Sequence, residues 1–315
     1  MFWLITYIRN LLFNKGLFKS KSFEDVFILC VGNIRVGGTG KTPMVEYLIK
    51  NLKEEYNIAV LSLGYKRKTK GLREITPFDD YLSVGDEPKQ MSEKFSDVRF
   101  FVNKDRNQAI EYIKQKYPTT QLIILDDAYQ YRKTKPEKTI LLTEYNRPFY
   151  SDFVIPYGRL RERRIEKRRA DYIVVTKSPK EISIEDKQTI ISKIKPLKSQ
   201  QVFFSSIKYN EDLKAELKDK EVALLVGIDN PQPLISYLST FCKVKQMLKF
   251  PDHHSFSDKE KQIISKLTYP IITTEKDYSR LKDLNIKLYV QKIEPDMDNN
   301  FLKKLKQDIN SFYAK

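Results

Sequence analysis

Cysteine and histidine are both scarce in this chain of 315 residues, which contains two of each. The cysteines, Cys30 and Cys242, lie in separate apolar runs that are typical of strands. Two such residues can form neither a disulfide framework nor a cysteine-rich metal site, so we expect a protein of a reducing cytoplasm. The histidines, His253 and His254, are adjacent, and because neighbouring side chains diverge, we expect at most one of them to act in catalysis.

A hydrophobic run long enough to cross a bilayer is also missing, since a membrane-spanning helix needs about 20 apolar residues. The most apolar stretch, residues 1–13, is shorter than this. It has neither a basic segment before its apolar part nor a small-residue cleavage site, so we do not expect a signal peptide.

Residues 1–13 nevertheless have the pattern of a helix with one strongly apolar face. Leu4, Ile8 and Leu11 share that face, and lysines follow the run. Such a helix can lie in the interface of an anionic membrane, or it can pack on the protein's own core. The sequence leaves both readings open, and we carry the first forward as a prediction for residues 1–24, a membrane-surface helix followed by a basic linker.

Low-complexity tracts and internal repeats are absent from the sequence as well. Its hydrophobic content of 41% and charged content of 31% are typical of folded globular proteins rather than disordered ones. The net charge of +16 indicates an anionic partner, which can be nucleic acid, a phospholipid surface or a phosphorylated substrate. Charge alone does not distinguish among these partners.

Strand-like and helix-like segments alternate from residue 25 onward. Strands are predicted at 25–31, 58–63, 98–102, 121–125, 139–143 and 172–176, with helices over 42–54 and 105–117. Apolar strands that are separated by helices indicate an α/β fold with a parallel sheet flanked by helices. A second, shorter series begins near residue 201, so we expect a main domain over residues 25–205 and a smaller α/β domain over residues 206–315.

The strongest motif is a glycine-rich turn between an apolar run and a helical segment, over residues 26–43. Because glycines let the backbone approach an anion closely, successive N–H groups of such a turn can hold one phosphate, as in P-loop NTPases. Lys41 is expected to reach the β- and γ-phosphates, and the Thr42 hydroxyl to hold Mg²⁺. Arg35 stands where the strict motif has glycine. The predicted nucleotide-binding residues of the turn are Gly37, Gly38, Thr39, Gly40, Lys41 and Thr42.

Two pairs of carboxylates are candidates for the chemistry. Asp126 and Asp127 follow an apolar strand directly, where a carboxylate of a P-loop fold faces the metal ion of the nucleotide, although an isolated pair there would more often be a polar turn. Asp86 and Glu87 lie in a long segment after another predicted strand. A carboxylate at that place could accept the proton of an attacking hydroxyl, or Asp86 could be the N-cap of the following helix.

The densest basic cluster lies at residues 159–169. It is compatible with phosphate, with a membrane surface, with nucleic acid or with a solvated surface of the protein. No aromatic platform and no nucleic-acid-binding module accompany it, so we do not expect a nucleic-acid partner.

These motifs, in this order, resemble those of the tetraacyldisaccharide 4′-kinase family, the lipid A 4′-kinases of Gram-negative bacteria, over almost the whole chain. The segments that carry the resemblance are Val36-Gly37-Gly38-Thr39-Gly40-Lys41-Thr42-Pro43, Gly85-Asp86-Glu87-Pro88, Asp105-Arg106, Asp126-Asp127 with Gln130, Leu160-Arg161-Glu162, Asp252-His253 and Thr274-Glu275-Lys276-Asp277. The family also lacks the first glycine of the strict motif, which accounts for Arg35. The chain departs from the family at Ala128 and Tyr131, where glycine and histidine are usual, and at Arg159, where proline is frequent.

The resemblance implies a kinase that uses ATP and Mg²⁺ and transfers the γ-phosphate to the 4′-hydroxyl of tetraacyldisaccharide 1-phosphate. It implies a monotopic enzyme at the cytoplasmic face of the inner membrane, with an acylated disaccharide phosphate lipid and an anionic membrane surface as partners. It also implies two α/β/α domains joined by a two-stranded hinge, for which residues 201–207 and 286–293 are our candidates. The alternative is a membrane-associated P-loop ATPase of regulatory or partitioning type, which also combines a variant glycine-rich loop with an amphipathic helix.

By the same resemblance, Asp86 is the catalytic base and His253 its charge partner. Lys41 and Arg161 act on the phosphates during transfer, and Arg106 contacts phosphate as well. The implied metal-binding residues are Thr42, Asp126, Asp127, Glu87 and Glu162.

Overall fold

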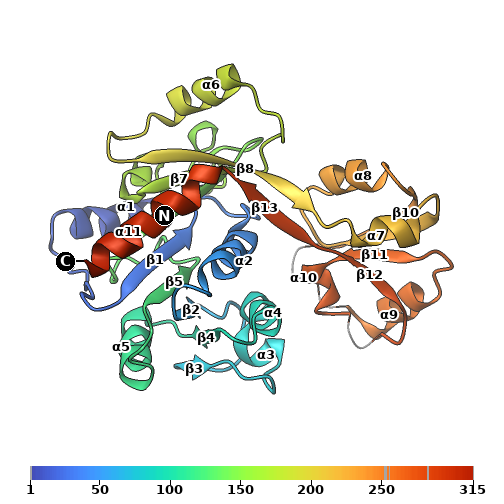
Figure 1. The fold of residues 1–315 in the computed structure, drawn as a ribbon, viewed down its shortest axis with the longest axis horizontal. Coiled ribbons are helices and arrows are strands. Elements are labelled where there is room, and N and C mark those ends of the chain that lie inside the picture. Colours follow the sequence, from blue (N-terminus) through green and yellow to red (C-terminus); the bar gives the residue numbers. More distant parts are fainter. Residues whose placement is uncertain (1, 252–253, 255, 282–283, 315) are drawn as a thin grey trace. The chain divides into compact units, whose positions relative to one another are not determined.

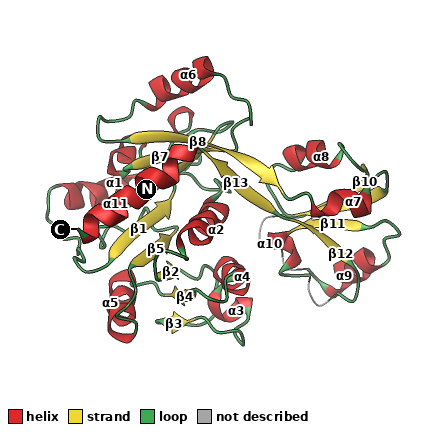
Figure 2. Cartoon of the chain, viewed as in Figure 1, coloured by secondary structure: helices red, strands yellow, loops and turns green. Residues whose placement is uncertain are grey.

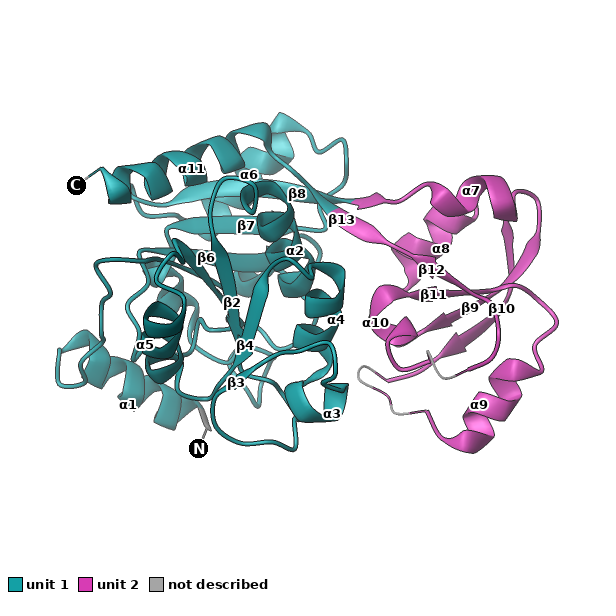
Figure 3. Cartoon of the chain, turned by 60° about the horizontal axis from the view of Figure 1, so that its bottom comes forward, with its two compact units in different colours: residues 1–207, 295–315 teal, residues 208–294 magenta. Residues whose placement is uncertain are grey.

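The computed structural model describes residues 2–251, 254, 256–281 and 284–314. They form two compact units (Figure 3): unit 1 comprises Met1–Ile207 and Pro295–Lys315, and unit 2 comprises Lys208–Glu294. Each unit has its own sheet with helices packed on it (Figure 2). The predicted α/β class, with a parallel sheet flanked by helices and a second, smaller sheet, is confirmed.

Unit 1 is built on a large sheet with the strand order β13-β8-β7-β6-β1-β5-β2-β4-β3 (Figure 1). Neighbouring strands from β8 to β4 are parallel, and only the short β3 is antiparallel to its neighbour β4 among the pairings described. The strands are β1 (Phe27–Gly32), β2 (Ile58–Ser62), β3 (Arg73–Glu74), β4 (Arg99–Val102), β5 (Leu122–Asp126), β6 (Lys138–Glu144), β7 (Tyr172–Thr176), β8 (Gln201–Tyr209) and β13 (Ile293–Met297).

Helices cover both faces of this sheet because alternate residues of its strands point to opposite sides. Phe27, Leu29 and Val31 of β1 pack in one core cluster with α2, α4 and α11, whereas Ile28 and Cys30 pack on the other face with α5. A third cluster joins β6 and β7 to α6. The helices of unit 1 are α1 (Phe2–Asn14), α2 (Lys41–Leu52), α3 (Tyr81–Val84), α4 (Asp86–Lys94), α5 (Arg106–Lys116), α6 (Ile184–Ile194) and α11 (Asn299–Tyr313), with short 3₁₀ helices η1 (Phe149–Ser151) and η2 (Arg164–Arg169).

Unit 2 has a parallel sheet of its own, in the order β10-β9-β11-β12. Helix α8 packs with one of its core clusters and α9 with the other. The elements are α7 (Asp212–Leu217), β9 (Glu221–Val226), α8 (Gln232–Leu238), β10 (Lys243–Lys249), α9 (Asp258–Ser265), β11 (Ile271–Thr274), α10 (Glu275–Tyr278) and β12 (Leu288–Gln291).

The chain passes between the units within β8 and within β13, which are neighbours in the large sheet. Strand β8 corresponds to the predicted connecting strand at 201–207. The second predicted connecting strand, residues 286–293, is wrong. Most of that range forms β12, which belongs to the small sheet, and the strand that connects the units is β13, which begins at Ile293. The alternating pattern runs through Lys292 without a break, so the end of one strand and the start of the next could not be seen in it.

The end of the chain also differs from the predicted domain at 206–315, because residues 295–315 return to unit 1. Phe301, Leu305 and Ile309 of α11 are fully buried in the core cluster that contains α2. Their spacing predicts an amphipathic helix, but it does not say against which sheet the apolar face packs.

Helix α1 buries a polar side chain against unit 1 and leaves most of its apolar ones exposed, although Leu12 and Phe13 are partly buried. Asn10 is buried and Arg9 is partly buried, whereas Ile5 and Ile8 are 59% and 46% exposed. Of the described side chains of α1, none joins a hydrophobic core cluster. The reading in which the apolar face of this helix packs on the protein's own core is therefore contradicted.

Among the helices that the structure describes, none is both long enough and apolar enough to span a bilayer.

Candidate active site

The carboxyl ends of the central parallel strands bring several predicted site residues together. Strands β1 and β5 are adjacent, with Val31 opposite Asp126, so the glycine-rich turn after β1 starts beside the acidic pair at the end of β5. In open α/β sheets, ligands bind in the crevice outside the carboxyl ends of the strands. The turn and the acidic pair occupy that position.

The glycine-rich turn is fixed by side chains from both of its flanks. Asn33 Nδ2 donates to Thr39 Oγ1 over 2.6 Å. At the end of β7, the Thr176 hydroxyl donates to the Thr39 carbonyl (2.9 Å) and Lys177 Nζ donates to the Gly38 carbonyl (2.6 Å). These bonds hold the backbone of the turn from the end of β7, while the Thr39 N–H donates to the Gly37 carbonyl within the turn over 3.0 Å.

The turn ends in the N-terminus of α2, which is an anion-binding element in itself. Gly40 is the N-cap, with φ 85°, a left-handed conformation that glycine adopts without strain. Lys41 is the first helical residue, and its Nζ lies 3.7 Å from Asp127 Oδ2. Thr42 follows in the same turn and is partly exposed.

Arg35, the departure from the strict motif, is a buried anchor of the turn. Its guanidinium pairs with Asp152 over 2.9 Å and lies 3.5 Å from Glu144. The backbone beside it also binds the basic segment, since the Arg161 N–H donates to the Ile34 carbonyl over 2.7 Å. The residue that replaces glycine thus connects the start of the turn to the segment that carries Arg161.

Asp126 is a buried carboxylate with part of its hydrogen-bonding capacity unused. Oδ2 accepts a hydrogen bond from the Ser62 hydroxyl over 3.0 Å, while Oδ1 has no hydrogen-bond partner among the described residues. Burial raises the pKa of Asp126 to about 7; Glu87 and Asp127 act in the same direction, and Lys41 opposes them. Such a group is poised to receive a cation.

The oxygen atoms at the end of β5 and at the start of α2 fit a Mg²⁺ ion bound together with a nucleotide better than a metal site made of protein ligands alone. In the part of the chain that the structure describes, no three His, Cys, Asp or Glu side chains group into a metal site. Mg²⁺ usually takes one or two carboxylates and completes its shell with phosphate oxygens and water. Asp126 and Asp127, with the Thr42 hydroxyl and with Glu87 close enough to affect Asp126, meet that requirement.

Glu162 does not join this group. Its Oε1 accepts from Arg9 and Asn10 of α1, and its Oε2 pairs with Arg169. The side chain is completely buried, and both of its oxygens are used in these contacts. The prediction that Glu162 binds the metal ion is therefore not supported by its position, and we leave it out of the metal-binding set.

Asp86 is the first residue of α4, and the N-cap of that helix is Gly85. The alternative in which Asp86 caps the helix is therefore wrong. Gly85 has φ 95°, and a Cβ there would lie 3.2 Å from the backbone of Gly64, so both the conformation and the space require glycine. This close approach fixes where α4 starts and thus where Asp86 stands.

The predicted charge partner of Asp86, His253, lies outside the described residues. Its neighbour His254 belongs to a local structure at the start of α9. His254 Nε2 lies 2.9 Å from Oε1 of Glu260, the residue that completes the capping box of α9, and its ring stacks on Phe250 at a centroid distance of 4.9 Å.

Arg106 is buried at the N-terminus of α5 and is held by Tyr131. The Tyr131 hydroxyl accepts from the Arg106 N–H over 3.2 Å and donates to Asp105 over 3.0 Å, and the guanidinium lies over its ring at 5.1 Å. Burial lowers the pKa of Arg106, and the charges of Asp126 and Asp127 oppose that shift. Tyr131, which stands where the family usually has histidine, thus positions a cation near the acidic pair.

Arg161, which the sequence predicts to act on phosphate, lies against Asp127 of the acidic pair. Its guanidinium is 3.3 Å from Asp127 Oδ1 and donates to Gln130 Oε1 over 3.1 Å. Gln130 in turn donates to the Asn33 carbonyl at the start of the glycine-rich turn, over 2.7 Å.

Sequence analysis missed the supports of the turn, Glu144 and Lys177. Each stands at or just after the carboxyl end of a buried strand, and the two side chains form an ion pair over 2.5 Å. The signal that singled out Asp126 and Asp127, a polar residue directly after an apolar strand, could have found both.

Comparison with known proteins places these features in a family. A family model described as tetraacyldisaccharide-1-P 4′-kinase (LpxK) matches residues 1–310. The tetraacyldisaccharide 4′-kinase of Flavobacterium johnsoniae is 44% identical over 293 residues, covering 90% of this chain and 85% of its own. That of Phocaeicola vulgatus is 41% identical over 295 residues, covering 87% and 80%.

A solved structure agrees with these sequence matches. The crystal structure of the "apo" form of LpxK from Aquifex aeolicus in complex with ATP matches with a TM-score of 0.77 and 27% identity, covering 99% of this chain and 96% of that one. The regulatory or partitioning ATPase is not favoured by these matches. The chain belongs to the tetraacyldisaccharide 4′-kinase family.

Proposed function

We propose that this chain transfers the γ-phosphate of ATP to the 4′-hydroxyl of tetraacyldisaccharide 1-phosphate, a step of lipid A biosynthesis. The observation that carries the proposal is the position of Lys41, at the N-terminus of α2 and 3.7 Å from Asp127, beside the buried Asp126. These are the parts that phosphoryl transfer needs, because it relies on positioning and charge more than on covalent chemistry.

Each residue of the site has a role in that reaction. The N–H groups of the three glycines of the turn and the Lys41 ammonium hold the β- and γ-phosphates, and Arg106 and Arg161 supply further positive charge. Asp86 accepts the proton of the attacking hydroxyl. Asp126, Asp127, Thr42 and Glu87 hold Mg²⁺, which when bound neutralises negative charge on the phosphates.

The surface of α1 supports a lipid acceptor and a membrane location. Ile5, Ile8 and Trp3 are between 45% and 59% exposed on one element, and Arg163 of the basic segment lies over the Tyr7 ring at 5.2 Å. Exposed apolar side chains next to basic ones are typical of helices in the interface of an anionic membrane. Because ATP is a cytoplasmic substrate, we place the protein at the cytoplasmic face of the inner membrane.

The reaction is tested with γ-labelled ATP, Mg²⁺ and tetraacyldisaccharide 1-phosphate. We expect a labelled bis-phosphorylated lipid, and ATP consumption that depends on the lipid. The matched control omits only the acceptor. ATP turnover at an equal rate in that control, without any labelled lipid, contradicts the kinase and agrees with the ATPase alternative.

The membrane location is tested by replacing Ile5 and Ile8 with glutamate. Sedimentation with anionic vesicles is expected to weaken at least about tenfold, since burial of one such side chain is worth roughly 1.5–3 kcal/mol. The fold is expected to survive because both side chains are exposed. Ile184→Glu, at a position of α6 that is 70% exposed, is the matched control. Unchanged sedimentation of the double variant contradicts insertion of α1.

A further inference from the structure

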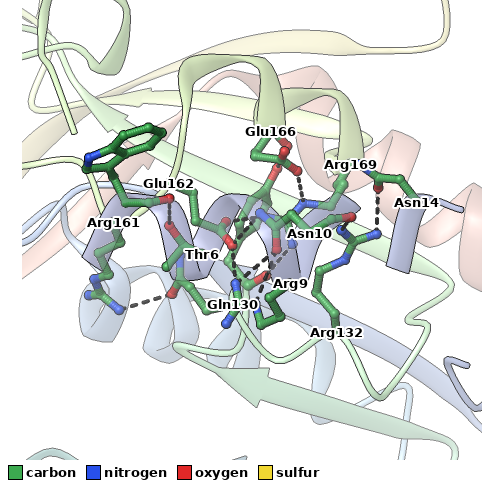
Figure 4. Close-up of polar contacts among 12 residues, drawn as sticks. Thr6, Arg9, Asn10, Asn14, Gln130, Arg132, Arg161, Glu162, Glu166 and Arg169 are labelled. Carbon is green, nitrogen blue, oxygen red and sulfur yellow. Dashed lines mark hydrogen bonds and ion pairs between the residues drawn. The ribbon is translucent and has the colours of Figure 1, made fainter. Parts of the chain in front are cut away.

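The docking of α1 depends on one buried carboxylate. Arg9 Nη2 donates to Glu162 Oε1 over 2.5 Å and Asn10 Nδ2 donates to the same oxygen over 3.0 Å, while the Arg169 guanidinium binds Oε2 (Figure 4). Arg132 completes the contact by donating to the Asn10 carbonyl over 3.0 Å. None of the described side chains of α1 joins an apolar core cluster, and the Arg132 guanidinium lies over the Phe13 ring at 4.9 Å. The polar bonds are therefore a main part of what holds the helix on unit 1.

The same carboxylate is adjacent in sequence to a residue of the active site. Glu162 follows Arg161, whose guanidinium donates to Gln130 (Figure 4). The same guanidinium lies 3.3 Å from Asp127 Oδ1. One peptide unit separates the two residues, and the Arg161 N–H donates to the Ile34 carbonyl over 2.7 Å. A displacement of the backbone at Glu162 therefore displaces the backbone that carries the Arg161 side chain.

A second connection runs through Arg169. Besides Glu162, its guanidinium donates to the Tyr129 carbonyl over 2.8 Å and lies over the Tyr129 ring at 4.2 Å. Residues 129–132 follow the acidic pair after one intervening residue, Ala128. They bind α1 through Arg132 and the active site through Gln130. The docking site of α1 and the phosphate site therefore share both the 161–169 segment and the 129–132 segment.

We infer that Glu162 is a positioning residue: it clamps α1 to the segments that carry Arg161 and Gln130, and so couples the placement of the N-terminal helix to phosphoryl transfer. The inference rests on the proposed kinase function for its activity readout. It assigns Glu162 a role through Arg161, in place of contact with the metal ion. The helix that offers its apolar side to lipid thereby holds the Arg161 guanidinium against Asp127.

A double-mutant cycle of Arg9→Gln and Glu162→Gln tests this coupling. Each single variant is expected to lower kcat by roughly 10–100-fold, because a misplacement of about 1 Å at a catalytic group can cost about 100-fold. The double variant is expected to be no slower than Glu162→Gln, since residues that act through one contact are not additive. The Mg²⁺ concentration for half-maximal rate and the KM for ATP are expected to stay within about twofold of wild type.

Lys198→Gln is the matched control, because it removes one positive charge from an exposed position of unit 1 outside this cluster. Glu162→Asp, with a shorter carboxylate, is expected to recover part of the rate. If the losses in kcat of the two single variants multiply in the double variant, the inference is contradicted. If the Mg²⁺ concentration for half-maximal rate rises in Glu162→Gln alone, the inference is contradicted and Glu162 is assigned to the metal site. Wild-type rate in Arg9→Gln contradicts it as well.

Hydrogen exchange gives a readout that does not need the lipid reaction. In Glu162→Gln we expect faster exchange both in α1 and in residues 129–132, relative to wild type. Faster exchange in α1 alone contradicts the coupling. If the wild-type protein makes no phosphorylated lipid, the proposed function is contradicted. The comparison of hydrogen exchange still tests the coupling through Glu162 in that case.

Discussion

Replacing Asp86 with asparagine is expected to lower kcat by about 10²–10⁴-fold, which is the usual contribution of a general base. Asparagine keeps the shape of the side chain but cannot accept the proton of the acceptor hydroxyl. Asp86 stands in the first turn of α4. The KM for ATP is expected to be unchanged, because we assign nucleotide binding to Lys41 and the glycine-rich turn. Steady-state transfer of label to the lipid measures both quantities.

Asp97→Asn is the matched control for that variant, since it removes an exposed carboxylate just beyond the end of α4, where Asp97 pairs with Lys53. Its kcat is expected to stay within about twofold of wild type, because an exposed ion pair contributes little. Wild-type kcat in Asp86→Asn rules out this residue as the base. A large rise in the KM for ATP assigns Asp86 to nucleotide binding instead.

The sequence predicts the position of those site residues that directly follow a strand or a turn. Lys41 and Thr42 follow a glycine-rich turn, and Asp126 follows an apolar strand, so the strand–turn–helix pattern predicts their place at the carboxyl edge of the sheet. Parallel pairing of β1 with β5 then brings the two motifs together.

Contacts between distant segments could not be predicted in this way. Glu162 lies in a basic run beside Arg161, which favours a phosphate or metal role, and nothing near it in sequence indicates that Arg9 binds it. The pairing of Arg35 with Asp152 is equally distant along the chain. The chain separation in each case exceeds one hundred residues, so only the folded sheet brings the partners together.

The spacing of apolar residues predicts that a helix has one apolar face, but it does not predict whether that face is buried. Helix α1 and helix α11 both have an apolar face, yet α11 buries Phe301 and Leu305 whereas α1 exposes Ile5 and Ile8. The difference follows from what each helix meets: α11 packs on apolar strand residues, and α1 meets a charged carboxylate. Exposure of an apolar face in a folded chain is thus a sign of a further partner.

Asp126→Asn is expected to change activity and stability in opposite directions. Loss of the carboxylate removes a ligand that we propose for Mg²⁺, so phosphoryl transfer is expected to fall roughly 10²–10³-fold. In metal-free buffer the same change is expected to stabilise the protein, because Asp126 is buried and its Oδ1 has no hydrogen-bond partner among the described residues. Urea unfolding in the presence of a chelator and the lipid kinase assay measure the two effects.

The sign of the stability effect depends on pH. Burial raises the pKa of Asp126 from 3.8 to about 7, so the unfolded chain releases this proton at a lower pH than the folded one does. The carboxylate therefore costs stability progressively as the pH rises from about 4 to 7, and the full shift corresponds to roughly 4 kcal/mol above that range. Asp126→Asn is expected to be more stable than wild type by about 2–4 kcal/mol at pH 8, with the difference disappearing near pH 4.

Glu137→Gln separates the two effects. Burial also raises the pKa of Glu137, from 4.5 to about 7, and this carboxylate accepts from the Ile28 N–H over 2.7 Å at the opposite end of β1 from the glycine-rich turn. Its replacement is expected to stabilise the protein by about 1–2 kcal/mol at pH 8, less than the full shift because the group is partly exposed, and to leave kcat unchanged.

Two outcomes would contradict the roles given to Asp126. If Asp126→Asn keeps wild-type kcat, the buried carboxylate destabilises the fold without contributing to catalysis, and Asp126 is not a ligand of the metal ion. If it is less stable than wild type at pH 8, its interactions with Lys41 and Ser62 outweigh its burial, and the carboxylate is part of what holds the fold.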